Sequence, residues 1–281
     1  MKLFTLTIYL FLLNFTNLIA LQQGERAWLS NARFIASVRL RELEQERLGS
    51  GFLCTATLIN NWNVLTTATC VAFYLSSQLQ VVMGAIDLDS RNRQAISRNI
   101  RRMYFHPTFE RNSEESEFIG NVAVLQFTTS IREPTSEWSW LFRPNRNLHI
   151  QPVRMSTSFP ENAPERCAFF AWGQQSEDSP RYRNLLMANL HILDNNPMCR
   201  NSSTVFCAGD INKGAALCKN LGGSLICEQK FFGIAITNSC EGPGHFHSIA
   251  SYRNWIWVAA KGNNLKFSFL LIFLIFINKF L

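Results

Sequence analysis

The chain has 281 residues, of which 47% are hydrophobic and 17% are charged, and its formal net charge is +7. This composition excludes an intrinsically disordered protein and suits one β-rich globular domain with a sizeable core. The moderate positive charge favours acidic partners or surfaces but identifies none of them.

Residues 1–20 have the pattern of a secretory signal peptide. Lys2 precedes an apolar run, and cleavage after Ala20 would make Leu21 the first residue of the mature chain. We therefore expect the protein to be secreted or held on the extracellular face of the plasma membrane. Behind such a signal, the eight cysteines are expected to form four disulfides, and no two have the Cys-x-x-Cys spacing of a zinc site. We expect neither a metal nor a cofactor.

Short apolar runs broken by polar turns follow, the pattern of antiparallel strands in a barrel or sandwich. We expect strands at residues 34–40, 52–58, 64–67, 80–83, 122–127, 150–153, 167–172, 185–193 and 231–237. A polar stretch at 128–147 is predicted to be a connector. Residues 252–260 are the best helix candidate, because Ile256, Ala259 and Ala260 have helical spacing.

The last segment, residues 262–281, contains an apolar run from 267 to 281. As a helix this run would rise about 22 Å, short of the roughly 30 Å of a bilayer core. Gly262, Asn263 and Asn264 lie just upstream, and small or polar residues before an apolar tail are typical of a removable glycolipid-anchor (GPI) signal. A short membrane span, or an apolar tail with neither role, are the alternatives.

Several short motifs occur in a fixed order along the chain. They are SGFLCTATLI (50–59), VLTTATC (64–70), FHP (105–107), GNVAVL (120–125), CAFFAWG (167–173), FCAG (206–209) and a closing run from 233 to 256. Each is weak alone, but in order and spacing together they resemble the trypsin/chymotrypsin-like serine proteases over residues 21–261.

This resemblance implies an all-β fold with two six-stranded antiparallel β-barrels, a cleft between the barrels and a C-terminal α-helix. It also implies four disulfides that use every cysteine of the chain: Cys54–Cys70, Cys167–Cys227, Cys199–Cys207 and Cys218–Cys240.

The catalysis of this family requires a serine, a histidine and a buried aspartate, and the chain differs at all three matched positions. Thr69 stands where the histidine precedes a cysteine, and Asn121 where the aspartate opens a strand. The nucleophile segment, CKNLGGSLIC, is one residue short. Counting from its last cysteine puts Leu221 at the serine position, and counting from its first cysteine puts Gly222 there. We therefore predict a proteolytically inactive homologue, or pseudoprotease.

Other matched positions depart from the family as well. Asn220 replaces the aspartate that pairs with the activated N-terminus, and Ala216 replaces the aspartate that selects basic side chains in trypsin-like members. The substrate-pairing edge Ser-Trp-Gly is matched by Ile-Thr-Asn at 236–238. Ser224 is the only serine near the nucleophile position, and the missing residue falls where the oxyanion hole would form, so we expect that hole to be deformed.

A basic cluster is the main candidate for a binding surface. Arg91, Arg93, Arg98, Arg101 and Arg102 have no acid among them and form either an exosite for an acidic partner, such as a sulphated glycan, or an ordinary solvated face.

Three further features of the sequence concern single residues. Asn201 opens an Asn-Ser-Ser glycosylation acceptor. His106 is expected in a structural His-Pro turn. His245 and His247 would share one face of a strand and suit a metal, but two histidines alone are more often ordinary surface residues.

The leading hypothesis is an extracellular binding or regulatory protein. Its partner would be another protein (a protease, a protease substrate or a cell-surface molecule) or an acidic glycan, and we expect no nucleic acid. The alternatives are a membrane-tethered structural or adhesion protein, and an endopeptidase with an unorthodox site around Ser224.

Overall fold

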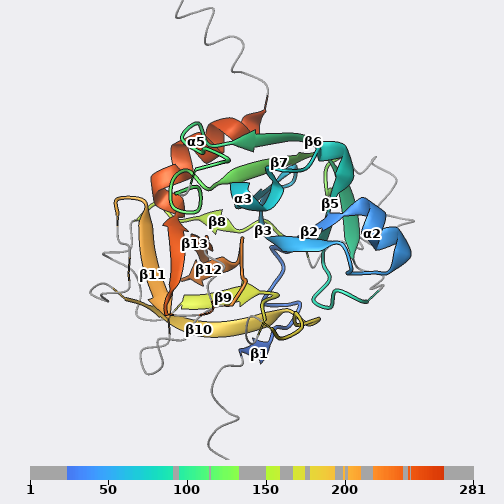
Figure 1. Ribbon diagram of the computed structural model, residues 1–281, viewed down its shortest axis with the longest axis horizontal. Helices are drawn as coiled ribbons and strands as arrows, with labels where there is room; N and C mark the ends of the chain where they lie inside the picture. Colours follow the sequence, from blue (N-terminus) through green and yellow to red (C-terminus); the bar gives the residue numbers. More distant parts are fainter. Residues whose placement is uncertain are drawn as a thin grey trace, which may run out of the picture.

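The computed structural model describes residues 24–90, 95–113, 115–132, 150–158, 167–174, 178–193, 199, 202–209, 218–236, 240 and 242–262. The predicted signal peptide and the apolar run at 267–281 lie outside these residues, so both stay predictions. In the described part of the chain, two β-barrels pack together and a C-terminal helix lies along one end of the molecule (Figure 1).

The first barrel closes from six antiparallel strands in the order β2-β3-β4-β7-β6-β5. Their bounds are β2 (Ile35–Leu40), β3 (Phe52–Asn60), β4 (Asn63–Thr66), β5 (Leu79–Met83), β6 (Ile96–Phe105) and β7 (Ala123–Phe127). Three short helical segments lie in the connections between its strands: α2 (Arg41–Glu46), α3 (Ala68–Val71) and the 3₁₀ turn η1 (Ser76–Gln78). Inward-facing apolar side chains such as Val38, Leu58 and Phe127 are fully buried and fill its interior.

The second barrel closes in the order β9-β10-β11-β14-β13-β12, because β9 pairs with both β10 and β12. Its strands are β9 (Cys167–Ala171), β10 (Leu186–Ile192), β11 (Val205–Gly209), β12 (Ser224–Cys227), β13 (Lys230–Ala235) and β14 (Gly244–Ser248). Two-residue strands add to its walls, β1 (Glu25–Arg26) on β10 and β8 (Arg154–Met155) on β13. The helix α5 (Ile249–Lys261) follows β14 directly. The predicted fold, two six-stranded barrels with a C-terminal helix, is confirmed.

Four disulfides join the pairs Cys54–Cys70, Cys167–Cys227, Cys199–Cys207 and Cys218–Cys240, the pairing that the resemblance implies. Cys54–Cys70 ties β3 to α3, and Cys167–Cys227 ties the two strands that close the second barrel. Such cross-links stabilise a fold mainly by restricting the unfolded chain.

One expected strand is wrong. Residues 150–153 have no strand pairing but cross between the barrels, where Gln151 N–H donates to Arg33 O (3.1 Å) and Val153 N–H to Leu58 O (3.0 Å). Pro152 lies between them and has no N–H with which to continue a ladder. The segment is therefore an extended linker with single backbone anchors.

The two barrels share a core rather than merely touching. One apolar cluster contains Leu65 and Val124 from the first barrel, Phe170 and Ile234 from the second, and Ile256 from α5. This packing fixes the relative position of the loops that meet between the barrels. Within the described ranges, no helix is both long and apolar enough to cross a membrane.

Candidate functional site

Thr69 and Asn121 lie together at the junction of the barrels. Thr69 is in the first turn of α3, which follows β4 directly, and Asn121 precedes β7. The Asn121 side-chain oxygen accepts hydrogen bonds from Thr69 N–H (2.9 Å) and from Thr69 Oγ1 (3.1 Å). Its amide nitrogen donates to Glu117 O (3.2 Å). The fully buried Asn121 amide thus caps the start of α3. Neither the threonine hydroxyl nor the asparagine amide titrates near neutral pH.

A buried histidine is hydrogen-bonded to the backbone of this pair. His247 Nε2 accepts the backbone N–H of Asn121 (3.2 Å), and Nδ1 lies 3.4 Å from Thr204 O, so the ring is neutral with its proton on Nδ1. Burial is the main cause that lowers the pKa of His247 from 6.5 to about 4. The expectation that His247 is a surface residue is wrong: it is fully buried. Its partner on the strand face, His245, is half-buried and packs edge-on against Phe118.

The nucleophile segment turns sharply against β3 and β4, where Thr55 and Thr66 lie close to it. Gly222 has a φ of 75°, and a Cβ there would collide with Thr55 O, so the position excludes a side chain. Leu221 is therefore the residue that carries a side chain at the turn. Its carbonyl accepts Thr55 N–H (3.1 Å), and its side chain packs on the apolar core of the first barrel. An alkyl side chain there cannot attack a carbonyl group.

Ser224, the serine nearest to this turn, points into the protein. It is the first residue of β12, is fully buried, and its hydroxyl lies 2.5 Å from Thr57 Oγ1 of β3. The two hydroxyls form a polar link between the barrels. In this position Ser224 has no access to a substrate.

An arginine that no motif predicted lies beneath the nucleophile segment. Arg181 Nη1 donates to Trp172 O (2.7 Å) and to Lys219 O (3.3 Å), and its guanidinium lies 4.7 Å from the centre of the Phe52 ring. Burial, with a smaller contribution from Arg183, lowers its pKa. Arg181 is outside every matched motif, so no sequence signal could have identified it.

The predicted basic cluster is only partly described. Arg91 and Arg93 lie outside the described residues, as do the predicted glycosylation site Asn201 and the cleft positions Ala216 and 237–238. The guanidinium of Arg98 is already hydrogen-bonded within the protein, because its Nε and Nη2 donate to Ser130 O (3.2 and 3.1 Å).

Arg101 and Arg102 are both exposed despite being neighbours in β6. The ladder between β6 and β7 shifts register between Ile100 and Arg102, and this bulge turns two consecutive side chains outward.

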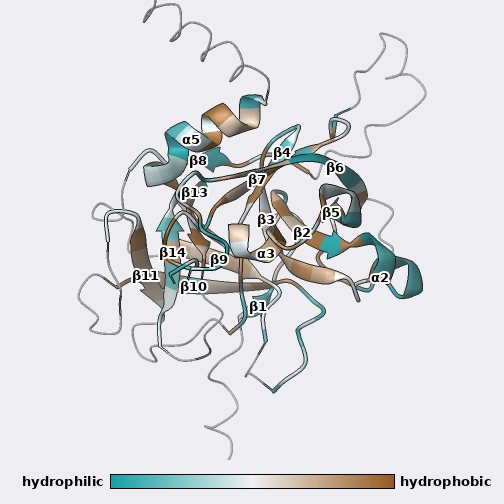
Figure 2. Ribbon diagram, turned by 45° about the horizontal axis from the view of Figure 1, so that its top comes forward, coloured by the Kyte–Doolittle hydropathy of each residue, from teal (hydrophilic) through white to brown (hydrophobic). Residues whose placement is uncertain are grey.

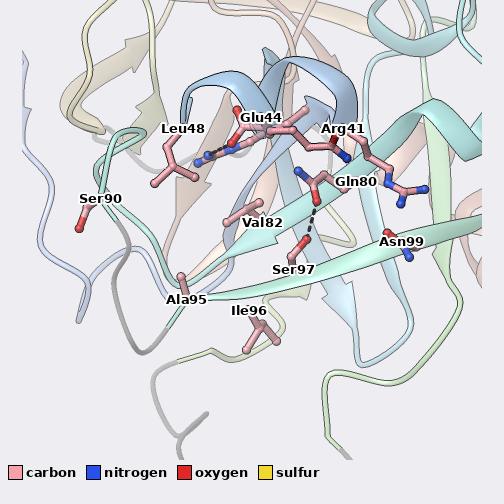
Figure 3. A pocket seen from close by; sticks show the side chains of 12 residues that line it. Arg41, Glu44, Leu48, Gln80, Val82, Ser90, Ala95, Ile96, Ser97 and Asn99 are labelled. Atoms are coloured by element: carbon pink, nitrogen blue, oxygen red, sulfur yellow. Dashed lines mark hydrogen bonds and ion pairs between the residues drawn. The ribbon is translucent and has the colours of Figure 1, made fainter. Parts of the chain in front are cut away.

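A separate hollow of about 360 Å³ lies on the α2 side of the first barrel (Figure 3). Its lining includes Gln80 and Ser97, which are hydrogen-bonded (2.9 Å), and the buried ion pair Arg39–Glu44 (2.9 Å). A positive and a negative group therefore lie side by side in the wall of the hollow. The charge of the Arg39 guanidinium is neutralised by that of the Glu44 carboxylate.

A sequence model of the trypsin family matches residues 22–256. Among curated relatives, a venom plasminogen activator of Trimeresurus albolabris is 27% identical over 76% of this chain and 80% of its own, and the thrombin-like enzyme bhalternin of Bothrops alternatus is 29% identical over the same shares. Among solved structures, mouse neuropsin (TM-score 0.66, 20% identity) covers 84% of this chain and 98% of its own.

Human heparin binding protein has a TM-score of 0.66 and 22% identity, and the match covers 85% of this chain and 96% of its own. The family match over most of the chain, together with the two barrels and their disulfides, leads to one conclusion. The protein is a member of the trypsin family of serine proteases.

Proposed function

We propose that this protein is a pseudoprotease that acts outside the cell as a binding or regulatory protein. The observation that carries the proposal is the hydrogen-bonded pair Thr69–Asn121, because the motif resemblance matches these two positions to the family's histidine and aspartate. With Leu221 at the nucleophile turn, the three matched positions supply no base, no orienting carboxylate and no nucleophile. The four disulfides and the venom relatives indicate an extracellular protein.

The surroundings of the pair support a binding role. Phe73 and Leu75 follow α3 and are 67% and 69% exposed, and Ile119, two residues before Asn121, is 46% exposed. Large apolar side chains that are exposed near one another are typical of protein interaction sites. Heparin binding protein, a structural neighbour, is named for binding rather than for proteolysis. A protein partner fits these features.

Labelling with an active-site-directed fluorophosphonate tests the loss of catalysis. We expect no labelling of the purified protein under conditions in which trypsin is labelled stoichiometrically, because Ser224 is buried and no base lies at Thr69. Stoichiometric labelling that Ser224→Ala abolished would refute the proposal. Reproducible cleavage of a broad peptide library, retained through purification and lost in the same variant, would refute it as well.

A further inference from the structure

The outward face of α5 carries exposed apolar side chains near its end. Ile249, Tyr252, Ile256 and Ala259 are buried against the barrels at helical spacing. On the other side Trp257 is 55% exposed and Val258 39% exposed. The Lys261 ammonium lies 3.3 Å from the centre of the Trp257 ring. Figure 2 shows the apolar colouring in the C-terminal half of the helix.

The end of α5 is fixed to the first barrel by two side chains. Asn63 of β4 donates from its amide to Ala260 O (2.9 Å), and the hydroxyl of Tyr104 in β6 donates to Gly262 O (3.2 Å). Gly262 is the left-handed cap that ends the helix. The chain therefore leaves the domain at a defined point, in a position set by strands of the barrel.

More aromatic and basic side chains lie at the same end. Trp62 immediately precedes Asn63 and is 47% exposed. Arg102 is two residues before Tyr104, so the two side chains share a strand face, and the bulge in β6 leaves Arg101 exposed beside it. The four segments that meet here, residues 60–66, 96–105, 122–128 and 249–262, contain no aspartate or glutamate.

From this arrangement we propose that the surface formed by Trp62, Arg101, Arg102, Trp257 and Lys261, which we term the α5-end face, lies against the headgroups of a phospholipid bilayer. Tryptophan is the residue type that partitions to the membrane–water interface, and arginine and lysine pair with lipid phosphates. Because these segments contain no acidic residue, they carry no negative side chain that would repel the phosphates of the lipid.

The position of the face relative to the rest of the chain agrees with this partner. The apolar run at 267–281 begins shortly after Gly262. Five extended residues span at most about 18 Å, so a chain that entered a bilayer at Phe267 would bring the α5-end face close to it. This inference concerns a surface that includes none of the matched catalytic positions, and it does not depend on the loss of catalysis.

A matched control exists at the opposite end of the molecule. Trp28, 72% exposed, follows β1, and Figure 1 shows β1 and α5 at opposite ends. Arg26 of β1 is likewise exposed. A bilayer held against the α5-end face cannot reach either residue.

Tryptophan quenching by brominated lipid tests the proposal. The full chain is reconstituted in phosphatidylcholine vesicles whose lipids carry bromine close to the headgroup. We expect Trp62→Phe and Trp257→Phe each to remove about half of the quenched emission, because two tryptophans share the interface. Trp28→Phe removes emission that the lipid does not quench. Equal effects of the three changes, or a vesicle-bound protein without quenching of Trp62 and Trp257, would overturn the proposal, since the protein would then be held through its tail alone.

Charge reversal tests the basic part of the face. In vesicles that also contain phosphatidylglycerol, the double change Arg102→Glu and Lys261→Glu is expected to lower the quenching at least twofold, whereas Arg26→Glu leaves it unchanged. Unchanged quenching in the double variant would show that the two cations do not contact the lipid and would overturn their assignment.

Discussion

Acidification is expected to destabilise the protein through His247 by about 3 kcal/mol. The folded state holds the pKa of this buried imidazole at about 4, and the unfolded chain restores a value of 6.5. Each pKa unit of difference between the two states corresponds to about 1.4 kcal/mol. Because Nε2 already accepts the Asn121 N–H, a proton on Nε2 also breaks that hydrogen bond.

The direction follows from the number of bound protons. Between pH 4 and 6.5 the unfolded chain binds a proton at His247 that the folded protein does not, so the free energy of unfolding rises with pH across this window. The contribution of His247 is complete above pH 6.5 and is lost as the pH falls to about 4. Burial also lowers the pKa of His106, which acts in the same direction, so a variant is needed to isolate His247.

Urea unfolding of the disulfide-intact protein, at pH steps between about 7.5 and 4, measures this contribution. His247→Phe is expected to lose about 1–3 kcal/mol at neutral pH, because the Asn121 N–H is then buried without a partner. Its stability falls less steeply with acid, so the free energy of unfolding of the wild type drops by about 3 kcal/mol relative to that of the variant between pH 6.5 and 4, and the two curves meet or cross in this range. Parallel curves for wild type and His247→Phe would refute the reasoning.

Three further changes test buried contacts, two at the nucleophile segment and one at the Arg39–Glu44 ion pair. Thr57→Val leaves the buried hydroxyl of Ser224 without its partner and should lower the free energy of unfolding by about 1–3 kcal/mol; the added change Ser224→Ala should recover part of this loss in a double-mutant cycle. Gly222→Ala should cost more than about 1 kcal/mol, since alanine is strained at a φ of 75° and its Cβ meets a backbone carbonyl. Glu44→Gln leaves the buried Arg39 guanidinium uncompensated and should cost about 3 kcal/mol, measured by urea unfolding.

Each of these changes has an outcome that contradicts it. A neutral Gly222→Ala would show that the turn can relax, and additive losses from the Thr57 and Ser224 changes would show that the hydroxyls do not interact. For the ion pair, Lys230→Ala is the matched control, because its exposed pair with Glu228 (3.8 Å) should contribute less than about 1 kcal/mol. Equal losses at both pairs would contradict the role of burial.

Motif order predicted the architecture better than apolar patterning predicted individual strands. The ten-residue strand β6 was not predicted. Three arginines and one asparagine occupy it, and its bulge interrupts the alternation of inward and outward residues. The helix α2 was missed as well. None of its apolar residues is buried, so helical periodicity gives no signal, and the buried ion pair from Glu44 to Arg39 helps to anchor it.

At the candidate site, the sequence predicted positions but not interactions. Thr69 and Asn121 were identified from short motifs, while their hydrogen bond joins residues far apart in the chain and appears only in the fold. Alternation along β14 predicted that His245 and His247 share a face, but not which face is buried. Arg181 carries no motif, because its role depends on the backbone carbonyls that surround it.

The attachment of Gly262 to the first barrel has a mechanical consequence. Tension applied at the C-terminus reaches Asn63 and Tyr104 at the end of α5, before it can unwind the helix from its last turn. Because these two side chains belong to different strands of a closed barrel, the load is shared across the barrel wall. The domain would thus withstand pulling from this terminus as one body, with the junction of the two barrels undistorted.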